Sequence, residues 1–436
     1  MKRRIIMVFV FVGILGLALN PGRAEAQTKK IRFWSDQSEP WQQEVIGKMI
    51  SEFESLNPDV KVEVEYIGWK DRQAKMTAAM ASGTEPEVAL LSSQYATSLP
   101  AQGALARMDD VMVDLGGPEA FYGAALSLAS YEGHFYSIPY SMLPVVIWYR
   151  KDRFDRIGLR PPETLSDFYE AAKLLHEKSG GKYFALGTPY GRGEYTDETF
   201  RALALWPMGG SVFDKEGKVV FDSPVTARAL SFYKSLYPFT PPGSETWGYS
   251  DTMKSFVSGS CAMTIYFGRT LKNLQQYNPE ILPKTGAMLP PKGEYQRTVN
   301  PPQSIGVFRN SKYPELGKKF VKFFFTSDQY VRFLWATPGH NVPVLKAKAA
   351  AWRQNELLQK YPEIVKVLLK ACDPKIGFSP TKPPGNPVAS PYWQPIRGSR
   401  VIPDAVQRVT LKNEDPEKVA KWAAEKIRQI MAEFKL

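Results

Sequence analysis

Strand and helix patterns alternate along the first third of the chain, and this alternation limits the fold more than any other feature. Three runs have the apolar or alternating composition of strands: residues 31–34, 60–66 and 88–91. Two runs between them have apolar residues at helical spacing: residues 41–53 and about 70–82. Gly83 follows the second helix as a natural C-terminal cap. A β-α-β-α-β order predicts a mainly parallel sheet with helices on both faces.

Polar segments follow two of these predicted strands. Residues 35–39 come after the first strand and residues 92–95 after the third. In parallel sheets, ligands bind in the loops beyond the carboxyl ends of strands. We therefore expect both segments to border a binding site.

The same pattern continues later in the chain. Strands are predicted over 145–149 and 262–266, a helix capped by Thr164 follows the first of them, and another opens at Ser223-Pro224. Long helical patterns cover residues 316–335 and about 416–434. Two proline-rich stretches, 290–302 and 380–395, are interpreted as ordered surface crossings.

The N-terminus has the three regions of a secretory signal in their usual order: charged, then apolar, then small residues. Lys2-Arg3-Arg4 precedes an uncharged apolar run of 15 residues, and Ala24-Glu25-Ala26 sets cleavage before Gln27. The alternative, a retained membrane anchor, is disfavoured because a spanning helix needs about 20 residues. No cysteine at the cleavage site offers a lipid attachment point. Removing 26 of the 436 residues leaves 410, a length that predicts two lobes.

The net charge and the cysteine content exclude few classes of protein, but they limit the kinds of partner that we expect. The formal net charge of +12 becomes +9 without the signal, and the lysines are scattered, so solvated helix faces are favoured over a nucleic-acid stripe. We therefore expect no nucleic-acid partner. Cys261 and Cys372 are the two cysteines; export permits a disulfide, but a buried free thiol at Cys261 explains the sequence equally well.

Catalytic and metal motifs are missing from the sequence. There is no G-x-S-x-G, no phosphate loop, no H-E-x-x-H and no C-x-x-C, and the three histidines are far apart. Carboxylates for glycoside hydrolysis could come from Asp36, Glu39, Glu194, Asp197 or Glu198. The last three are better interpreted as acids in the first turn of a helix. Ten tryptophans and 21 tyrosines, several beside polar loops, instead suit a sugar-like ligand.

Four stretches carry a family resemblance, in the family's order. They are Ala78–Val88 with A-x-G and P-E-V, Tyr131–Asp152 with its Y-S-I-P crossing and Y-R-K-D, Phe256–Met263 matching F-x-x-G-x-x-A-M, and Pro338–Val344 matching G-x-x-P. The chain resembles family 1 extracellular solute-binding proteins of ABC importers, the group that includes maltose-type receptors. Glu87 replaces the family's usual aspartate.

The resemblance implies an α/β fold of two lobes, each a mainly parallel sheet flanked by helices, with the ligand cleft between them. Lobe one is expected over 27–138 plus 304–345, and lobe two over 139–303 plus 346–436. It also implies a monomeric periplasmic receptor that delivers a carbohydrate or polyol to an inner-membrane ABC permease. No catalytic residue, cofactor or metal is expected.

The family's ligand-binding positions carry over to matching loops of this chain. They are Gln37, Glu39, Trp41, Ser93, Gln94, Tyr95, Tyr140, Ser141, Tyr190, Arg192, Glu194, Tyr266, Phe267, Arg269, Gln303, Ser304 and Trp393. Leu143 stands where maltose-type members can place a carboxylate, and Arg192 and Arg269 add cations. A receptor for a phosphorylated polyol, such as a glycerol phosphodiester, therefore stays open as an alternative. So does a secreted carbohydrate-cleaving enzyme.

Overall fold

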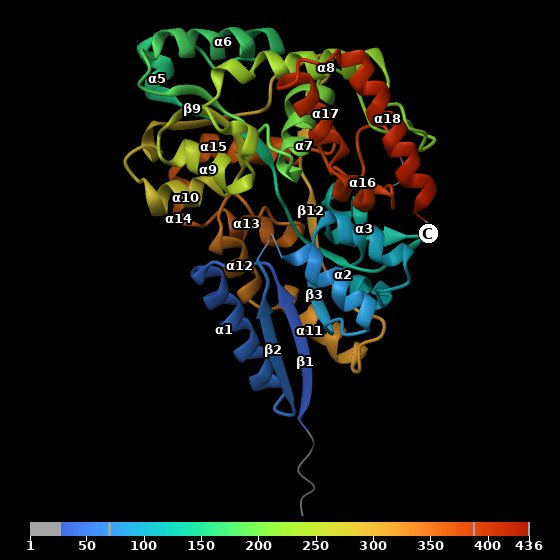
Figure 1. Ribbon diagram of the computed structural model, residues 1–436. Coiled ribbons are helices and arrows are strands. Elements are labelled where there is room, and N and C mark those ends of the chain that lie inside the picture. The colour runs from blue at the N-terminus through green and yellow to red at the C-terminus, as the bar shows by residue number, and fades with distance from the viewer. Residues whose placement is uncertain (1–27, 69–70, 387–388, 435–436) are drawn as a thin grey trace, which may run out of the picture.

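A computed structural model describes residues 28–68, 71–386 and 389–434 (Figure 1). The expected cleavage site after Ala26 lies outside these residues. The described chain forms two α/β lobes, one below the other in Figure 1, and each is built around its own sheet. No described helix is both long enough and apolar enough to cross a bilayer.

The first lobe contains a five-stranded sheet in the order β2-β1-β3-β12-β6. Its strands are β1 (Lys29–Ser35), β2 (Val60–Tyr66), β3 (Val88–Leu91), β6 (Ile138–Met142) and β12 (Pro302–Val307). β1 pairs in parallel with β2 and β3, whereas β12 is antiparallel to β3 and β6. Its helices are α1 (Pro40–Leu56), α2 (Arg72–Ser82), α3 (Ser93–Ala101), α4 (Asp109–Asp114), α11 (Pro314–Thr326) and α12 (Gln329–Ala336).

The second lobe contains a four-stranded sheet in the order β10-β7-β9-β8. Its strands are β7 (Val145–Arg150), β8 (Phe184–Gly187), β9 (Cys261–Phe267) and β10 (Thr285–Met288). Around it lie α5 (Lys151–Arg156), α6 (Leu165–Lys178), α7 (Glu194–Phe200), α8 (Pro224–Ser235), α9 (Tyr249–Val257), α10 (Thr270–Tyr277), α14 (Glu356–Lys360), α15 (Pro362–Ala371), α17 (Val401–Thr410) and α18 (Pro416–Glu433). The short α13 (Ala349–Trp352) contacts α12, and α16 (Trp393–Ser399) contacts both α3 and α18. Two small ribbons pair β4 (Ser130–Tyr131) with β5 (His134–Phe135), and β11 (Thr298–Val299) with β13 (Gly377–Phe378).

Strand direction corrects the prediction of a mainly parallel sheet in each lobe. In the second sheet β7 is antiparallel to both β9 and β10, and only β8 and β9 run in parallel. The reason is the crossing: β7 enters from the first lobe and runs away from it, whereas β9 ends where β7 begins, with Phe267 paired to Val145. β6 and β12 belong to the first sheet, which moves the expected crossings at 138 and 304 by a few residues. The full lobe boundaries stay a prediction.

Local signals explain most element ends. Thr164 and Asp167 form the predicted capping box, with each backbone N–H bonded to the other side chain at 3.1 Å. Gly83 ends α2 in the left-handed conformation, at φ 66°. Two predictions were wrong in detail. Residues 316–335 do not form one helix, because the helical conformation is interrupted at Ser327, between α11 and α12. Residues 93–95 do not form a loop but the first turn of α3.

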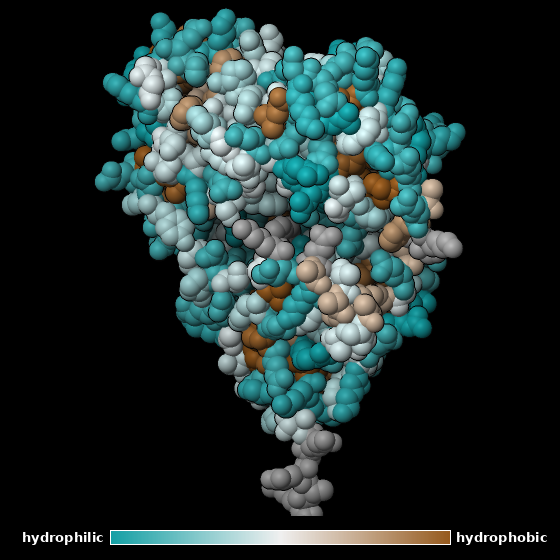
Figure 2. All heavy atoms as spheres, in the orientation of Figure 1, coloured by the Kyte–Doolittle hydropathy of each residue, from teal (hydrophilic) through white to brown (hydrophobic). Residues whose placement is uncertain are grey.

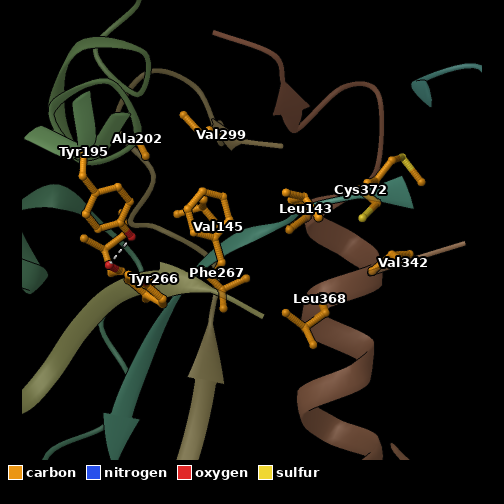
Figure 3. Packing of buried hydrophobic residues seen from close by; sticks show 14 of the residues in the cluster. Leu143, Val145, Tyr195, Ala202, Tyr266, Phe267, Val299, Val342, Leu368 and Cys372 are labelled. Carbon is orange, nitrogen blue, oxygen red and sulfur yellow. Dashed lines mark hydrogen bonds between the residues drawn. The ribbon is translucent and has the colours of Figure 1, made fainter. Parts of the chain in front are cut away.

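Aromatic and aliphatic side chains fill both cores. In the first lobe, Phe320 lies edge-on to Phe33 and Phe53, with ring centroids 5.3 and 5.1 Å apart. In the second, Tyr195 lies against Tyr266 and donates to the carbonyl oxygen of Ile265 at 2.8 Å (Figure 3).

The two cysteines, whose pairing the sequence left open, are free. Cys261 and Cys372 are both buried. Burial raises the pKa of Cys261 to about 12, so its thiol stays protonated at neutral pH.

Candidate functional site

A polar hollow lies between the two lobes. It contains about 380 Å³ of atom-free space, part of it open to solvent, and is lined by Arg72, Ser92, Gln94, Tyr95, Glu194, Gln394, Arg397 and Gly398. The first four residues belong to the first lobe, and the last four come from α7 and α16 on the second lobe's side. We call this hollow the interlobe cleft. In Figure 1, α16 lies directly above α3, and the two helices are in contact; hydrophilic side chains cover much of the same face in Figure 2.

The segment that follows strand β3 forms part of the first wall of the cleft. The strand ends at Leu91, so Ser92 and the first turn of α3 emerge at the carboxyl edge of the sheet, where ligands bind in such folds. Tyr95 is buried there, and burial raises its pKa to about 12; Glu194 adds to this rise, whereas Arg72 opposes it. A hydroxyl with this pKa is a neutral hydrogen-bonding group at physiological pH.

Arg72 is held by a carboxylate that the sequence placed in the first polar loop. Its Nη1 lies 2.5 Å from Oδ2 of Asp36, and both side chains are nearly inaccessible to solvent. Asp36 also accepts from Nε2 of Gln37 at 2.7 Å. The guanidinium carbon is 5.6 Å from the centroid of the Tyr95 ring. Arg72 therefore lines the cleft with its positive charge already balanced by Asp36.

The second wall is a charged cluster between α7 and α16. Glu194 and Glu198 are four residues apart, so they share one face of α7. Nη2 of Arg397 lies 3.0 Å from Oε2 of Glu194 and 2.6 Å from Oε1 of Glu198. Tyr249 accepts from Arg397 at 3.0 Å and donates to Glu198 at 2.9 Å. A single guanidinium therefore serves two carboxylates and a hydroxyl.

Burial shifts the titration of this cluster. It raises the pKa of Glu198, and the neighbouring Arg397 only partly offsets the shift. Burial also works against the charge of Arg397, but Glu194, Tyr249 and Glu198 outweigh it and keep the pKa of Arg397 well above its usual range. The guanidinium stays charged, and Glu198 is the group of this cluster whose affinity for a proton is raised.

Unused hydrogen-bonding atoms occur on both walls. Within the described residues, Oγ of Ser92 and Nε of Arg397 are buried and have no hydrogen-bond partner, and the same holds for Oε2 of Glu198. A buried polar group without a partner costs free energy, so these three atoms are unsatisfied hydrogen-bonding groups at or behind the walls of the cleft.

The lobes also touch directly beside the cleft. Oγ of Ser98 on α3 donates to Oε1 of Gln394 on α16 at 2.7 Å, and Thr97 lies 3.3 Å from the hydroxyl of Thr381. Both bonds join segments almost 300 residues apart, and they hold the two walls together.

Three of the seventeen predicted site residues line the cleft: Gln94, Tyr95 and Glu194. Ser93 is buried beside them, and Gln37 lies one contact behind, bonded to Asp36 and to Nε2 of Gln42 at 2.6 Å. Glu39 instead caps α1 in a capping box with Gln42, so it serves the helix.

Other predicted residues lie in the cores or on the outside. Tyr190 is fully buried and donates to the carbonyl oxygen of Tyr233 at 2.7 Å, and Arg192 makes an exposed ion pair with Asp404. Tyr140 packs against two phenylalanines of the first core. The other predicted residues buried outside the cleft lining are Ser141, Tyr266, Phe267, Gln303 and Ser304. Arg269 stands next to the Tyr266 ring, and Trp41 lines a separate groove.

Trp393 differs from what the resemblance implies. Its side chain is 1% exposed, and the guanidinium carbon of Arg201 lies 3.9 Å from its ring centroid. Phe213 contacts the same ring edge-on. The face expected to stack on a sugar is therefore covered by a cation of the protein itself.

Sequence reasoning missed Arg72, Gln394, Arg397 and Gly398 as cleft residues. Ser92 belongs to the segment 92–95 that was expected to border the site, although it was not among the seventeen named residues. Arg397 follows Trp393 by one helical turn, which is its only sequence signal. Within the described chain, no group of three or more His, Cys, Asp or Glu side chains is arranged to hold a metal ion.

Two α/β lobes face each other across a polar cleft, an arrangement that suits a protein that binds a small ligand. The chain belongs to the family of bacterial extracellular solute-binding proteins, whose family model matches residues 34–331. Its function is therefore solute binding.

Individual relatives agree with this assignment. "Putative ABC transporter periplasmic-binding protein YcjN" of Escherichia coli K12 is 27% identical over 346 residues, which are 78% of this chain and 79% of that protein. The sn-glycerol-3-phosphate-binding periplasmic protein UgpB of the same strain is 27% identical over 278 residues, 60% and 61% of the two chains. A solute-binding protein of an ABC transporter from Thermotoga lettingae, solved with alpha-D-tagatose, has the same fold; its TM-score is 0.78 at 21% identity, covering 92% of this chain and 99% of that chain.

Proposed function

We propose that this protein captures a carbohydrate or polyol in the interlobe cleft and delivers it to an ABC permease of the inner membrane. The observation that carries the proposal is the pair of buried polar atoms on opposite walls, Oγ of Ser92 and Nε of Arg397. Donors and acceptors at fixed positions suit ligand hydroxyls. A ligand that bonds both walls stabilises the closed arrangement more than an open one.

The charge of the cleft favours an uncharged ligand over a phosphorylated polyol. Both arginines on its walls already contact carboxylates, Arg72 through Asp36 and Arg397 through Glu194 and Glu198. A phosphate group would lie beside the negative charges of these acids, which is unfavourable. Because one relative is an sn-glycerol-3-phosphate-binding protein, the experiment below also tests phosphorylated polyols as ligands.

An enzymatic role receives no support from the same carboxylates. Glu194 and Glu198 both bond to one arginine, whereas glycoside hydrolysis needs an acid and a base on opposite sides of the scissile bond. We propose reversible binding without a chemical step, by a monomer in the periplasm that has no nucleic-acid partner.

A thermal-shift screen of the mature protein tests the proposal. Sugars and polyols are compared with their monophosphates, and each hit is checked for new reducing ends after incubation. We expect a sugar or polyol at 100 times its Kd to stabilise the protein by about 2.7 kcal/mol and to be recovered intact. Stabilisation by phosphates alone supports the alternative, and turnover would refute a pure receptor.

A further inference from the structure

A second groove crosses the lobe boundary away from the interlobe cleft. It is open to solvent, has a volume of about 270 Å³ and shares no lining residue with the cleft. Trp41 of α1 and Trp335 of α12 come from the first lobe, and Lys272 of α10 comes from the second. In Figure 1, α1 lies on the opposite side of the β1–β2 strands from α2 and α3. We call it the tryptophan groove.

Two indoles give the groove rigid apolar walls. Nε1 of Trp335 donates to the carbonyl oxygen of Trp352 at 2.9 Å, which fixes the orientation of that ring. Nε1 of Trp41 is buried without a hydrogen-bond partner among the described residues, and so is Oε1 of Gln329, which begins α12 and lines the same groove. Fixed aromatic faces beside unused polar atoms are typical of small-molecule sites, and the volume of about 270 Å³ is close to the lower end of the usual range.

The charge of the groove is positive. Three cations line it, Lys48, Lys272 and Arg332, against the single carboxylate of Glu44, which pairs with Lys48 at 2.7 Å. Nζ of Lys272 lies 5.9 Å from the centroid of the Trp41 ring. Within the part of the chain that the structure describes, it bonds only to Gln275, at 3.0 Å, so two of its three N–H donors remain.

Burial also lowers the pKa of Lys272, because part of its hydration is lost. An anion beside this ammonium would restore the missing interaction. An adjoining hollow shares Lys272 and Trp335 but contains Glu356, for which no ion pair is found among the described residues. Glu44 on the Trp41 side is instead paired with Lys48, so the anionic end of an occupant belongs on that side.

We propose that the tryptophan groove is a second binding site, for a small carboxylate that carries a flat ring face. The ring would lie against the indoles, and the carboxylate would accept from Lys272. Sugar acids and aromatic acids share this chemistry, and the test separates them.

Calorimetry on the mature protein uses two matched pairs of probes: D-glucuronate against glucuronamide, and benzoate against benzamide. We expect one carboxylate to bind with a Kd below about 1 mM and its amide to bind at least about tenfold more weakly. The carboxylate that binds identifies the ring class.

Variants locate the site. Lys272→Gln and Trp41→Leu should each weaken carboxylate binding about tenfold, a change that corresponds to about 1.4 kcal/mol. Lys426→Gln is the matched control, because Lys426 also donates to a glutamine three residues ahead at 3.0 Å, far from the groove. Gln94→Ala, in the interlobe cleft, should leave the affinity unchanged.

Thermal unfolding confirms that each variant is folded. The proposal is overturned if neither carboxylate binds at about 1 mM, if acid and amide bind equally, or if Gln94→Ala abolishes binding that Lys272→Gln leaves intact. The last result would place the carboxylate in the cleft.

Discussion

Arg397 and Glu198 form a buried ion pair, with 2.6 Å between Nη2 and Oε1 and both side chains almost completely inaccessible. The pair joins α16, near the end of the chain, to α7 in the middle, a separation of 199 residues. It forms the back of the second cleft wall. The geometry of the wall therefore depends on a contact that contributes to folding as well as to binding.

Removing Arg397 should destabilise the protein strongly. Arg397→Met leaves Glu198 buried without its partner, which costs about 3–5 kcal/mol, and the free energy of unfolding in urea measures it. Arg408→Met is the matched control, because its pair with Glu414 is partly exposed and should cost at most about 1 kcal/mol. Equal losses in the two variants would contradict the assigned role of the buried pair.

Glu198 should make stability depend on pH. Burial raises its pKa above the ordinary value of 4.5, although Arg397 and Tyr249 face it as opposing partners and Glu194 adds to the rise. The folded state thus binds the proton more tightly than the unfolded chain. The contribution of Glu198 is therefore fully present below pH 4.5 and is lost as the pH rises through the folded-state pKa.

The difference in unfolding free energy between the native protein and Glu198→Gln isolates this effect from other groups. We expect the native protein to lose stability relative to the variant as the pH increases. A constant difference between the two proteins from pH 4 to 8 would show that Glu198 has no shifted pKa.

Gly268 should tolerate no side chain. A Cβ at this position would collide with the carbonyl oxygen of Gly339, at the point where the end of β9 meets the segment after α12. Gly268→Ala should therefore cost about 1–3 kcal/mol. Gly47→Ala, in α1 where a Cβ would meet no neighbouring atom, should be neutral or stabilising. Thermal melts of both variants decide the question, and a neutral Gly268→Ala would mean that this contact is loose.

The hydrogen bond between Ser98 and Gln394 should help to keep the lobes closed. Ser98→Ala removes the donor and should weaken affinity for the cleft ligand about fivefold, since a net hydrogen bond contributes about 1 kcal/mol. Small-angle scattering of the unliganded variant should show a larger radius of gyration. Ser82→Ala, on the exposed end of α2, is the control, and identical scattering from both variants would rule out a closing role.

Local signals predicted the framework of the fold. Alternating residues gave β2, the capping pair Thr164 and Asp167 started α6, and Gly83 ended α2. These features depend only on neighbouring residues, which sequence patterns describe well. The end of β3 likewise placed Gln94 at the cleft, whereas Glu194, the first residue of α7, was expected there from the family resemblance.

Long-range contacts could not be predicted in this way. The direction of β7 depends on its entry from the other lobe, and the pairing of Arg397 with Glu198 depends on how α16 packs on α7. Trp393 was expected at the ligand, but whether its ring is open depends on Arg201, which lies 192 residues earlier. No local spacing reports such a contact.

Calorimetry of one sugar or polyol, taken from the thermal-shift screen, against three variants tests the central claim that the ligand binds between the lobes. Gln94→Ala and Ser92→Ala alter the cleft, whereas Arg192→Ala breaks only an exposed ion pair outside it. We predict that each cleft variant weakens binding at least about tenfold, a loss of about 1.4 kcal/mol, while Arg192→Ala binds like the native protein. Unchanged affinity in both cleft variants would contradict the account.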